Sequence, residues 1–248
     1  MNSNNAEINA EIDVEPHRQE IINNLNNVRS RIKALAQGRQ EVRLVTVSKL
    51  KPVSDISIAY EAGQRHFGEN YTQELIEKSK MLPLDIQWHF IGTVQSNKCK
   101  MLAAIPNLWA IETIEDISKA SMMNKACASR ETPLRVFVQV NTSGEETKNG
   151  IKPGECLLLL DHVLDNCENL KLTGLMTIGA RHRENVEQNP DFVILKNLQS
   201  QFKNYRGIDL ELSMGMSDDF EVAIKLGSTN VRIGSTIFGV RPSKNTLH

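Results

Sequence analysis

The 248-residue sequence lacks an excess of charge of either sign and lacks long apolar runs. It has 29 Lys plus Arg against 30 Asp plus Glu, for a formal net charge of −1. Binding of duplex nucleic acid depends mainly on clustered cationic side chains, and no such cluster stands out here. The densest apolar run, residues 156–160, is far too short to cross a bilayer. We therefore expect neither a nucleic-acid-binding protein nor a membrane protein, although a local site for one small anion remains open.

Cysteine is also scarce, and its spacing suits neither a metal site nor a disulfide framework. No C-x-x-C pair occurs among the four cysteines, which are Cys99, Cys127, Cys156 and Cys167. The six histidines show no ligand spacing, so we expect no metal, and His89 is expected to be a hydrogen-bonded core residue. Residues 1–16 contain four acidic and no basic residues, unlike a signal or transit peptide. These observations predict a soluble, cytoplasmic protein whose residues 1–16 form a disordered acidic tail.

What the sequence does contain is a regular alternation of short apolar runs and helix-period segments. Apolar residues at three- and four-residue steps predict a first helix over residues 17–37. Strands are then expected at residues 42–47, 66–67, 86–91, 108–111, 134–140, 170–176, 210–214 and 231–233. The helices between them are expected at residues 53–62, 71–81, 95–104, 115–128, 154–164, 191–205 and 220–226.

Strict alternation of eight strands with helices favours parallel pairing, and eight is the number that closes a (β/α)₈ barrel. The length allows one barrel or two small domains, but no linker interrupts the alternation. An open doubly wound sheet usually carries a Gly-rich loop after its first strand, which residues 48–52 do not provide. We therefore predict the α/β class: a single (β/α)₈ TIM barrel over residues 17–242 with an extra N-terminal helix, followed by a tail, residues 243–248.

The first expected strand ends in a lysine that is a candidate nucleophile. Chemistry in such barrels occurs at the C-terminal ends of the strands. Lys49 shares the orientation of Val45 and Val47 and would point into the barrel mouth. A partly desolvated lysine, with Lys51 nearby raising the positive potential, can act as a nucleophile and form a Schiff base with a carbonyl. The alternative is an ordinary solvated lysine at a strand end.

The loops after the seventh and eighth expected strands are rich in small residues. Gly234 and Ser235 follow strand eight, where many barrels bind phosphate through backbone N–H groups and a hydroxyl donor. Ser213 and Gly215 occupy the corresponding place at the C-terminal end of strand seven. These loops predict a phosphate site, although the glycines would equally serve tight turns alone.

Three further residues are candidates for contact with the ligand. Arg232 is expected to point inward, and its guanidinium needs an acceptor: a ligand ring nitrogen, a phosphate, or an acid such as Glu69 or Glu112. Asn70 ends strand two, where it would either offer its amide to the ligand or cap the next helix. Met214 would either pad a ring or fill the core.

Together these residues suggest a ligand that carries an aldehyde, a ring and a phosphate, which describes pyridoxal 5′-phosphate (PLP). The sequence resembles a known family, the pyridoxal phosphate homeostasis proteins, also called proline synthetase co-transcribed homologues, and its fungal members in particular. The resemblance covers nearly all of residues 42–242. It rests on motifs at residues 47–52, 67–71, 88–98, 174–178, 212–220 and 231–239.

The resemblance implies the fold of the N-terminal domain of alanine racemase without the C-terminal β-domain of that enzyme. It also implies that Lys49 forms the internal aldimine with PLP and that Arg232 faces the pyridine nitrogen. The residues that it assigns to the phosphate are Ser213, Gly234 and Ser235, and those that it assigns to the ring are Asn70 and Met214.

These features favour binding over turnover. An arginine that faces the pyridine nitrogen disfavours its protonation, and a racemase takes its second base from a domain for which the residues after 242 leave no room. We expect a monomeric carrier that maintains PLP, vitamin B6 and amino-acid balance, with apo forms of PLP-dependent enzymes as candidate recipients. Two alternatives remain open: a minor amino-acid racemase or lyase with Tyr71 as second base, and a cofactor-independent Schiff-base aldolase that acts on a phosphosugar.

Overall fold

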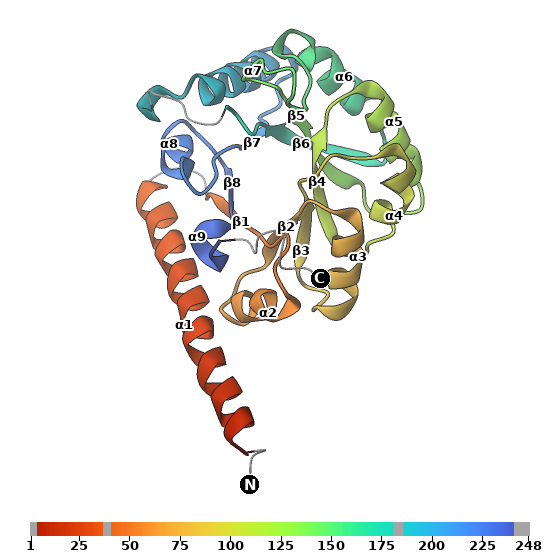
Figure 1. Cartoon of the computed structure of the whole chain (residues 1–248). Helices are drawn as coiled ribbons and strands as arrows, with labels where there is room; N and C mark the ends of the chain where they lie inside the picture. The colour runs from red at the N-terminus through yellow and green to blue at the C-terminus, as the bar shows by residue number, and fades with distance from the viewer. Residues whose placement is uncertain (1–3, 37–40, 181–185, 241–248) are drawn as a thin grey trace.

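Eight parallel strands form a closed barrel in a computed structural model, which describes residues 4–36, 41–180 and 186–240 (Figure 1). The strands follow one another around the barrel in chain order, and β1 pairs with β8 to close it. Their bounds are β1 (Arg43–Val47), β2 (His66–Glu69), β3 (Gln87–Phe90), β4 (Leu108–Ile114), β5 (Leu134–Gln139), β6 (Leu170–Met176), β7 (Glu211–Ser213) and β8 (Asn230–Ile233). The predicted single TIM barrel is confirmed.

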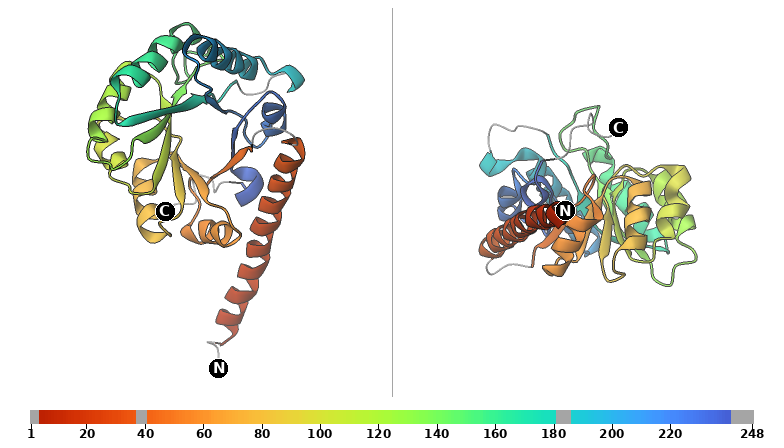
Figure 2. Two further views of the ribbon diagram at one scale, coloured as in Figure 1. Left: turned by 180° about the vertical axis from the view of Figure 1, so that it is seen from behind. Right: turned by 60° about the horizontal axis from the view of Figure 1, so that its bottom comes forward.

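Helices surround the barrel as the alternation predicts (Figures 1 and 2). The α-helices are α1 (Asn4–Leu35), α2 (Val53–Glu61), α3 (Thr72–Met81), α4 (Cys99–Ala103), α5 (Ile117–Ala126), α6 (Cys156–Asn166), α7 (Pro190–Arg206), α8 (Phe220–Lys225) and α9 (Ser235–Phe238). Single 3₁₀ turns lie at η1 (Ser96–Lys98), η2 (Pro153–Glu155) and η3 (Val186–Gln188). The expected tail of residues 243–248 lies outside the described residues.

The extra N-terminal helix is longer than expected. Because α1 begins at Asn4, the expected disordered tail is wrong for residues 4–16, while residues 1–3 lie outside the described part of the chain. Residues 4–15 contain no glycine and include alanine and glutamate, both strong helix formers. The second half of α1 packs against α2, α8 and α9, whereas its first half extends away from the barrel (Figures 1 and 2).

The strands separate two apolar layers. A large core lies between the barrel wall and the helices, and it includes side chains such as Phe67, Trp88 and Leu212. A small apolar cluster inside the barrel consists of Ala110, Phe137 and Met176, with Trp109 against it. Polar side chains occupy another part of the interior, and they lead to the site described next. Among the described residues, no helix is both long and apolar enough to cross a membrane.

Candidate functional site

Lys49 lies two residues beyond the end of β1, at the C-terminal end of the barrel. Alternation along β1 is established by Arg43, whose side chain reaches Glu211 of β7 inside the barrel (Nη1–Oε2, 2.5 Å). Val45 also faces inward, beside Gly68 of β2. Lys49 has the same parity as these two residues, and its side chain is half-buried. If the alternation of β1 continues through this turn, Lys49 faces the barrel mouth, and this orientation stays a prediction.

The turn that carries Lys49 contains an unusual backbone conformation. Leu50 has a φ of +60°, and it is the one non-glycine residue with positive φ in the described part of the chain. This conformation costs a non-glycine residue roughly 1–2 kcal/mol. The turn is closed by a hydrogen bond from the Lys51 N–H to the Ser48 carbonyl (3.1 Å). A strained turn therefore directly follows the candidate nucleophile.

Lys51 does not sit beside Lys49 as an isolated positive charge. Its ammonium group donates hydrogen bonds to the carbonyl oxygens of Phe238 (2.6 Å) and Val240 (3.1 Å), at the end of α9. These contacts join the β1 turn to the segment that follows β8. Lys51 thus fixes two loops of the barrel mouth relative to each other.

The loops after β7 and β8 meet at this same end of the barrel. The hydroxyl groups of Ser217 and Ser235 lie 3.2 Å apart. Gly215 has a φ of +97°, and a Cβ there would lie only 2.6 Å from the Ala223 side chain, so this position requires glycine. α9 begins directly after Gly234, so the first backbone N–H groups of α9 have no partner within the helix. Hydroxyl and N–H donors therefore gather where the sequence predicts a phosphate site.

Arg232 lies inside the barrel, level with Val45 on the neighbouring strand. Its side chain is buried and donates hydrogen bonds to the Ser213 hydroxyl (2.5 Å) and to the Thr177 carbonyl (2.8 Å). Ser213 in turn donates to Glu112 (2.5 Å). Of the two acids considered from the sequence, Glu112 is therefore linked to Arg232 through Ser213, whereas Glu69 pairs with Lys78 outside the barrel wall.

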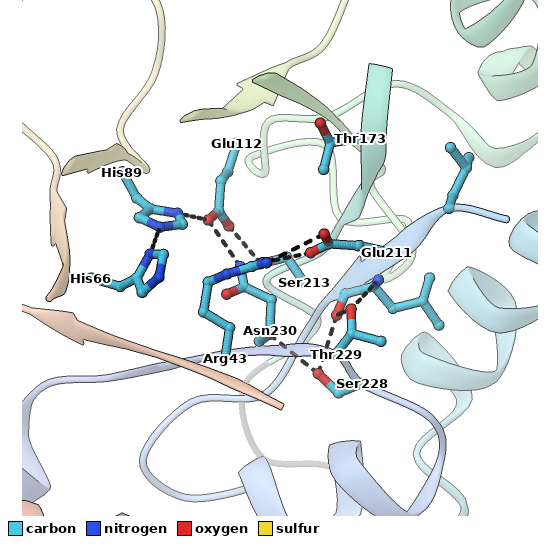
Figure 3. A network of polar contacts seen from close by, with 12 residues as sticks. Arg43, His66, His89, Glu112, Thr173, Glu211, Ser213, Ser228, Thr229 and Asn230 are labelled. Atoms are coloured by element: carbon cyan, nitrogen blue, oxygen red, sulfur yellow. Dashed lines mark hydrogen bonds and ion pairs between the residues drawn. The ribbon is translucent and has the colours of Figure 1, made fainter. Parts of the chain in front are cut away.

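Glu112 is the centre of a buried polar network inside the barrel (Figure 3). Its Oε1 accepts hydrogen bonds from His89 Nδ1 (2.5 Å) and Asn230 Nδ2 (2.9 Å), and its Oε2 accepts one from Ser213. Burial by itself raises the pKa of Glu112, but the contacts with His89, Arg232 and Ser213 outweigh burial and lower it to about 2. Glu112 is thus an ionised group that faces the positive charge of Arg232.

Two histidines extend this network toward the N-terminal end of the barrel. His66 Nδ1 lies 2.9 Å from His89 Nε2. Burial lowers the pKa of His89, and burial together with the neighbouring His89 lowers the pKa of His66 to about 3. Neutral His66 and His89 are therefore expected at physiological pH, with the Nδ1–H of His89 donated to Glu112. The prediction that His89 is a hydrogen-bonded core residue is confirmed.

Two residues that the resemblance assigns to the ligand, Ser213 and Met214, make other contacts in the structure. The Ser213 hydroxyl already donates to Glu112 and accepts from Asn230 and Arg232, so no capacity is left for a phosphate. Met214 is fully buried in the core between the barrel and the helices. Because Ser213 faces inward, strand alternation turns Met214 outward, and its side chain does not line the mouth.

The side chain of Asn70, at the mouth of the barrel, has a polar atom without a hydrogen-bond partner. Its Oδ1 atom is buried and has no hydrogen-bond partner in the structure. Tyr71, rather than Asn70, is the N-cap of α3, so Asn70 does not serve as the helix cap. A buried oxygen without a partner is costly, and a ligand donor would remove that cost. Tyr71 itself is 53% exposed, at the rim of the mouth.

Sequence reasoning missed Asn230 and Thr177, and it considered Glu112 only as one of two alternatives. The signal that could have identified Glu112 is a single charged residue within the mostly apolar β4, which extends to Ile114 rather than residue 111. Two cavities, of about 430 and about 140 Å³, lie at the opposite, N-terminal end of the barrel. We place the site at the C-terminal end because the strained turn, the orphaned amide oxygen and the inward cations are there.

Comparisons with known proteins identify the family of this chain. Residues 18–242 match the family described as alanine racemase, N-terminal domain. The pyridoxal phosphate homeostasis protein of Schizosaccharomyces pombe is 50% identical over 221 residues, which are 89% of this chain and 92% of that protein. The human pyridoxal phosphate homeostasis protein is 47% identical over 210 residues, which are 80% of this chain and 76% of that protein.

A solved structure shares both fold and sequence with this chain. PipY of Synechococcus elongatus, with PLP bound, is 30% identical and superposes with a TM-score of 0.76 over 88% of this chain and 100% of that chain. The resemblance stated from the sequence motifs is therefore confirmed. This chain belongs to the pyridoxal phosphate homeostasis protein family, within the broader family described as alanine racemase, N-terminal domain.

Proposed function

We propose that this chain binds PLP reversibly through Lys49 and thereby helps to maintain the cellular supply of this cofactor. The observation that carries the proposal is the half-buried Lys49, two residues beyond β1, in a barrel whose interior holds the buried cation Arg232. The Lys49 amine adds to the aldehyde carbon and water leaves, so that one C=N bond replaces the C=O bond. The reverse reaction with water releases the cofactor.

The other residues hold the cofactor without covalent contact. The hydroxyl of Ser235 and the backbone N–H groups after Gly234 would bind the phosphate, together with Ser217 from the β7 loop. The unpartnered Oδ1 of Asn70 would accept a hydrogen bond at the ring. Ser213 holds Arg232 and does not bind the phosphate.

Arg232 affects how strongly bound PLP can act as an electron sink. When bound, PLP supplies an electron sink through its pyridine ring, and this sink is strongest when the ring nitrogen is protonated. The guanidinium can only donate hydrogen bonds, so next to the ring nitrogen it would disfavour that protonation. Glu112 balances the charge of Arg232 through Ser213, without itself contacting the ligand. These contacts support binding with little catalytic turnover.

In this role the chain is a cytoplasmic, monomeric carrier that passes PLP to apo forms of PLP-dependent enzymes. The four cysteines are buried free thiols, which is compatible with a reducing compartment. The family name of the relatives supports the homeostatic role. Sedimentation of the purified protein tests the monomer, and transfer of PLP to an added apo-enzyme tests the carrier role.

Absorbance spectra of the purified protein test the covalent attachment. The wild type should show the band of lysine-bound PLP, and borohydride should convert the bond to a stable amine that mass spectrometry locates at Lys49. Lys49→Ala should lose the band, whereas the control Lys100→Ala, at an exposed lysine of α4, should keep it. An intact band in Lys49→Ala would overturn the proposal. Steady amino-acid turnover that is lost in Tyr71→Phe would instead favour a racemase or lyase.

A further inference from the structure

Behind the end of β1, outside the barrel wall, lies a buried group of charged side chains that the proposed cofactor contacts do not include. We call it the Lys78 cluster; its members are Ser48, Glu69, Glu74 and Lys78. Glu69 ends β2, Glu74 and Lys78 belong to α3, and Ser48 directly precedes Lys49. Glu69 and Lys78 are both buried. The cluster therefore joins α3 to the turn that carries the candidate nucleophile.

Lys78 has three acceptors in this cluster. Its ammonium group lies 2.7 Å from Glu69 Oε1, 2.6 Å from Glu74 Oε1 and 2.8 Å from the carbonyl oxygen of Ser48. An ammonium group has three N–H donors, so these contacts use all of them. The Ser48 hydroxyl also donates to Glu69 Oε1 (2.6 Å). Lys78 is thus held in one position, and it holds the Ser48 carbonyl in turn.

The second contact with the turn comes from Glu74. Its Oε1 accepts a hydrogen bond from the backbone N–H of Leu50 (2.7 Å). The Ser48 carbonyl and the Leu50 N–H belong to the two peptide groups that flank the Cα of Lys49. Both peptide groups are therefore bonded to one rigid cluster, and one of these bonds is to Leu50, the residue with positive φ.

We propose that the Lys78 cluster positions Lys49: Lys78 and Glu74 hold the two peptide groups on either side of it, so that its amine is presented to the aldehyde. This inference rests on the proposed function of Lys49. A strained turn tends to relax unless its surroundings hold it, and charge-assisted hydrogen bonds to backbone groups are among the stronger contacts that can do so. Lys78, Glu69 and Glu74 are positioning residues that do not touch the cofactor.

The matched variants lie on one helix. Glu74→Ala removes the acceptor of the Leu50 N–H, and because Glu74 is only partly buried, this variant is expected to fold. Lys78→Met removes all three contacts of the ammonium group. Glu77→Ala is the control: it is the same change on α3, at an exposed residue that accepts a hydrogen bond from Gln73 of the same helix.

Two measurements test the inference separately from the proposed function. Amide hydrogen exchange of Leu50, measured on the protein without cofactor, should be about tenfold faster or more in Glu74→Ala and unchanged in Glu77→Ala. The rate at which the apo-protein forms its lysine-bound PLP band should fall about tenfold or more in Glu74→Ala and Lys78→Met, and should be unchanged in Glu77→Ala.

The outcomes distinguish the positioning role of the Lys78 cluster from the proposed function of Lys49. Faster exchange at Leu50 together with slower bond formation supports the inference. Unchanged exchange in Glu74→Ala overturns it, and so does faster exchange with an unchanged rate of bond formation. If the wild type forms no lysine-bound band, or if Lys49→Ala forms it normally, the proposed function itself fails, whatever the exchange data show.

Discussion

Glu69, which ends β2, and Glu112, in the second half of β4, are two buried glutamates whose pKa values shift in opposite directions. Burial raises the pKa of Glu69 to about 7, although Lys78 and Ser48 both donate hydrogen bonds to it. Glu112 is equally buried, yet the contacts with His89, Arg232 and Ser213 lower its pKa to about 2. The two residues face opposite sides of the barrel wall.

The difference lies in how the two oxygens of each carboxyl group are bonded. Both donors to Glu69 reach Oε1, and its buried Oε2 has no partner. Glu112 accepts hydrogen bonds on both oxygens, from three residues. A buried carboxylate is stable when hydrogen bonds replace its lost hydration, and a single cation does not replace them all. The barrel interior therefore keeps an ionised acid, whereas the Lys78 cluster contains one that is half protonated near neutral pH.

The largest expected effect is the difference between two single variants, Glu112→Gln and Glu69→Gln, which make the same substitution at each site. Glu112→Gln should lower the free energy of unfolding by about 3–5 kcal/mol, because Arg232 then stays buried without a compensating charge. Glu69→Gln should change it by less than about 1 kcal/mol at pH 7, since Gln keeps the Oε1 acceptor and removes a poorly solvated charge. Urea unfolding of the two variants and the wild type measures both values. Equal losses in the two variants would contradict the comparison.

A second, intermediate effect is the pH dependence that Glu69 confers. Its pKa is about 7 in the folded protein against an ordinary value of 4.5, so the folded protein binds more protons than the unfolded chain between these values. The stability of the wild type relative to Glu69→Gln should therefore fall as the pH rises from about 4.5 to about 7, by up to about 3 kcal/mol. Urea unfolding of both proteins at about pH 5 and about pH 8 checks this slope, and a difference that rises with pH would contradict it.

The smallest of the three effects concerns a single donor to Glu112. Ser213→Ala removes the hydroxyl that links Glu112 to Arg232, and it should lower the free energy of unfolding by about 2 kcal/mol because both partners lose a buried hydrogen bond. The control Ser200→Ala, at an exposed serine of α7, should change it by no more than about 0.5 kcal/mol. If the free energy of unfolding falls no more in Ser213→Ala than in the control, the other donors to Glu112 are enough to stabilise it.

Much of this site follows from strand alternation alone. The same rule that predicts an inward Lys49 and Arg232 turns Met214 outward, so the core-filling role, one of the two considered for Met214, follows from its neighbour Ser213. The role of Ser213 could not, because its hydroxyl bonds to Glu112, which lies 101 residues earlier in the chain. The start of α1 escapes prediction for a different reason: the polar, acidic composition of residues 4–15 favours disorder, although this segment contains no residue that breaks a helix before Pro16.

The sequence by itself determined the barrel, the order of its elements and the candidate nucleophile, because hydrophobic periodicity and strand alternation are local properties of the chain. Only the tertiary structure decided which buried charges meet. Lys78 reaches the Ser48 carbonyl across 30 residues, and Asn230 reaches Glu112 across 118. Closure of the barrel brings these groups together, and their hydrogen bonds then set which glutamate stays ionised and how Lys49 is held.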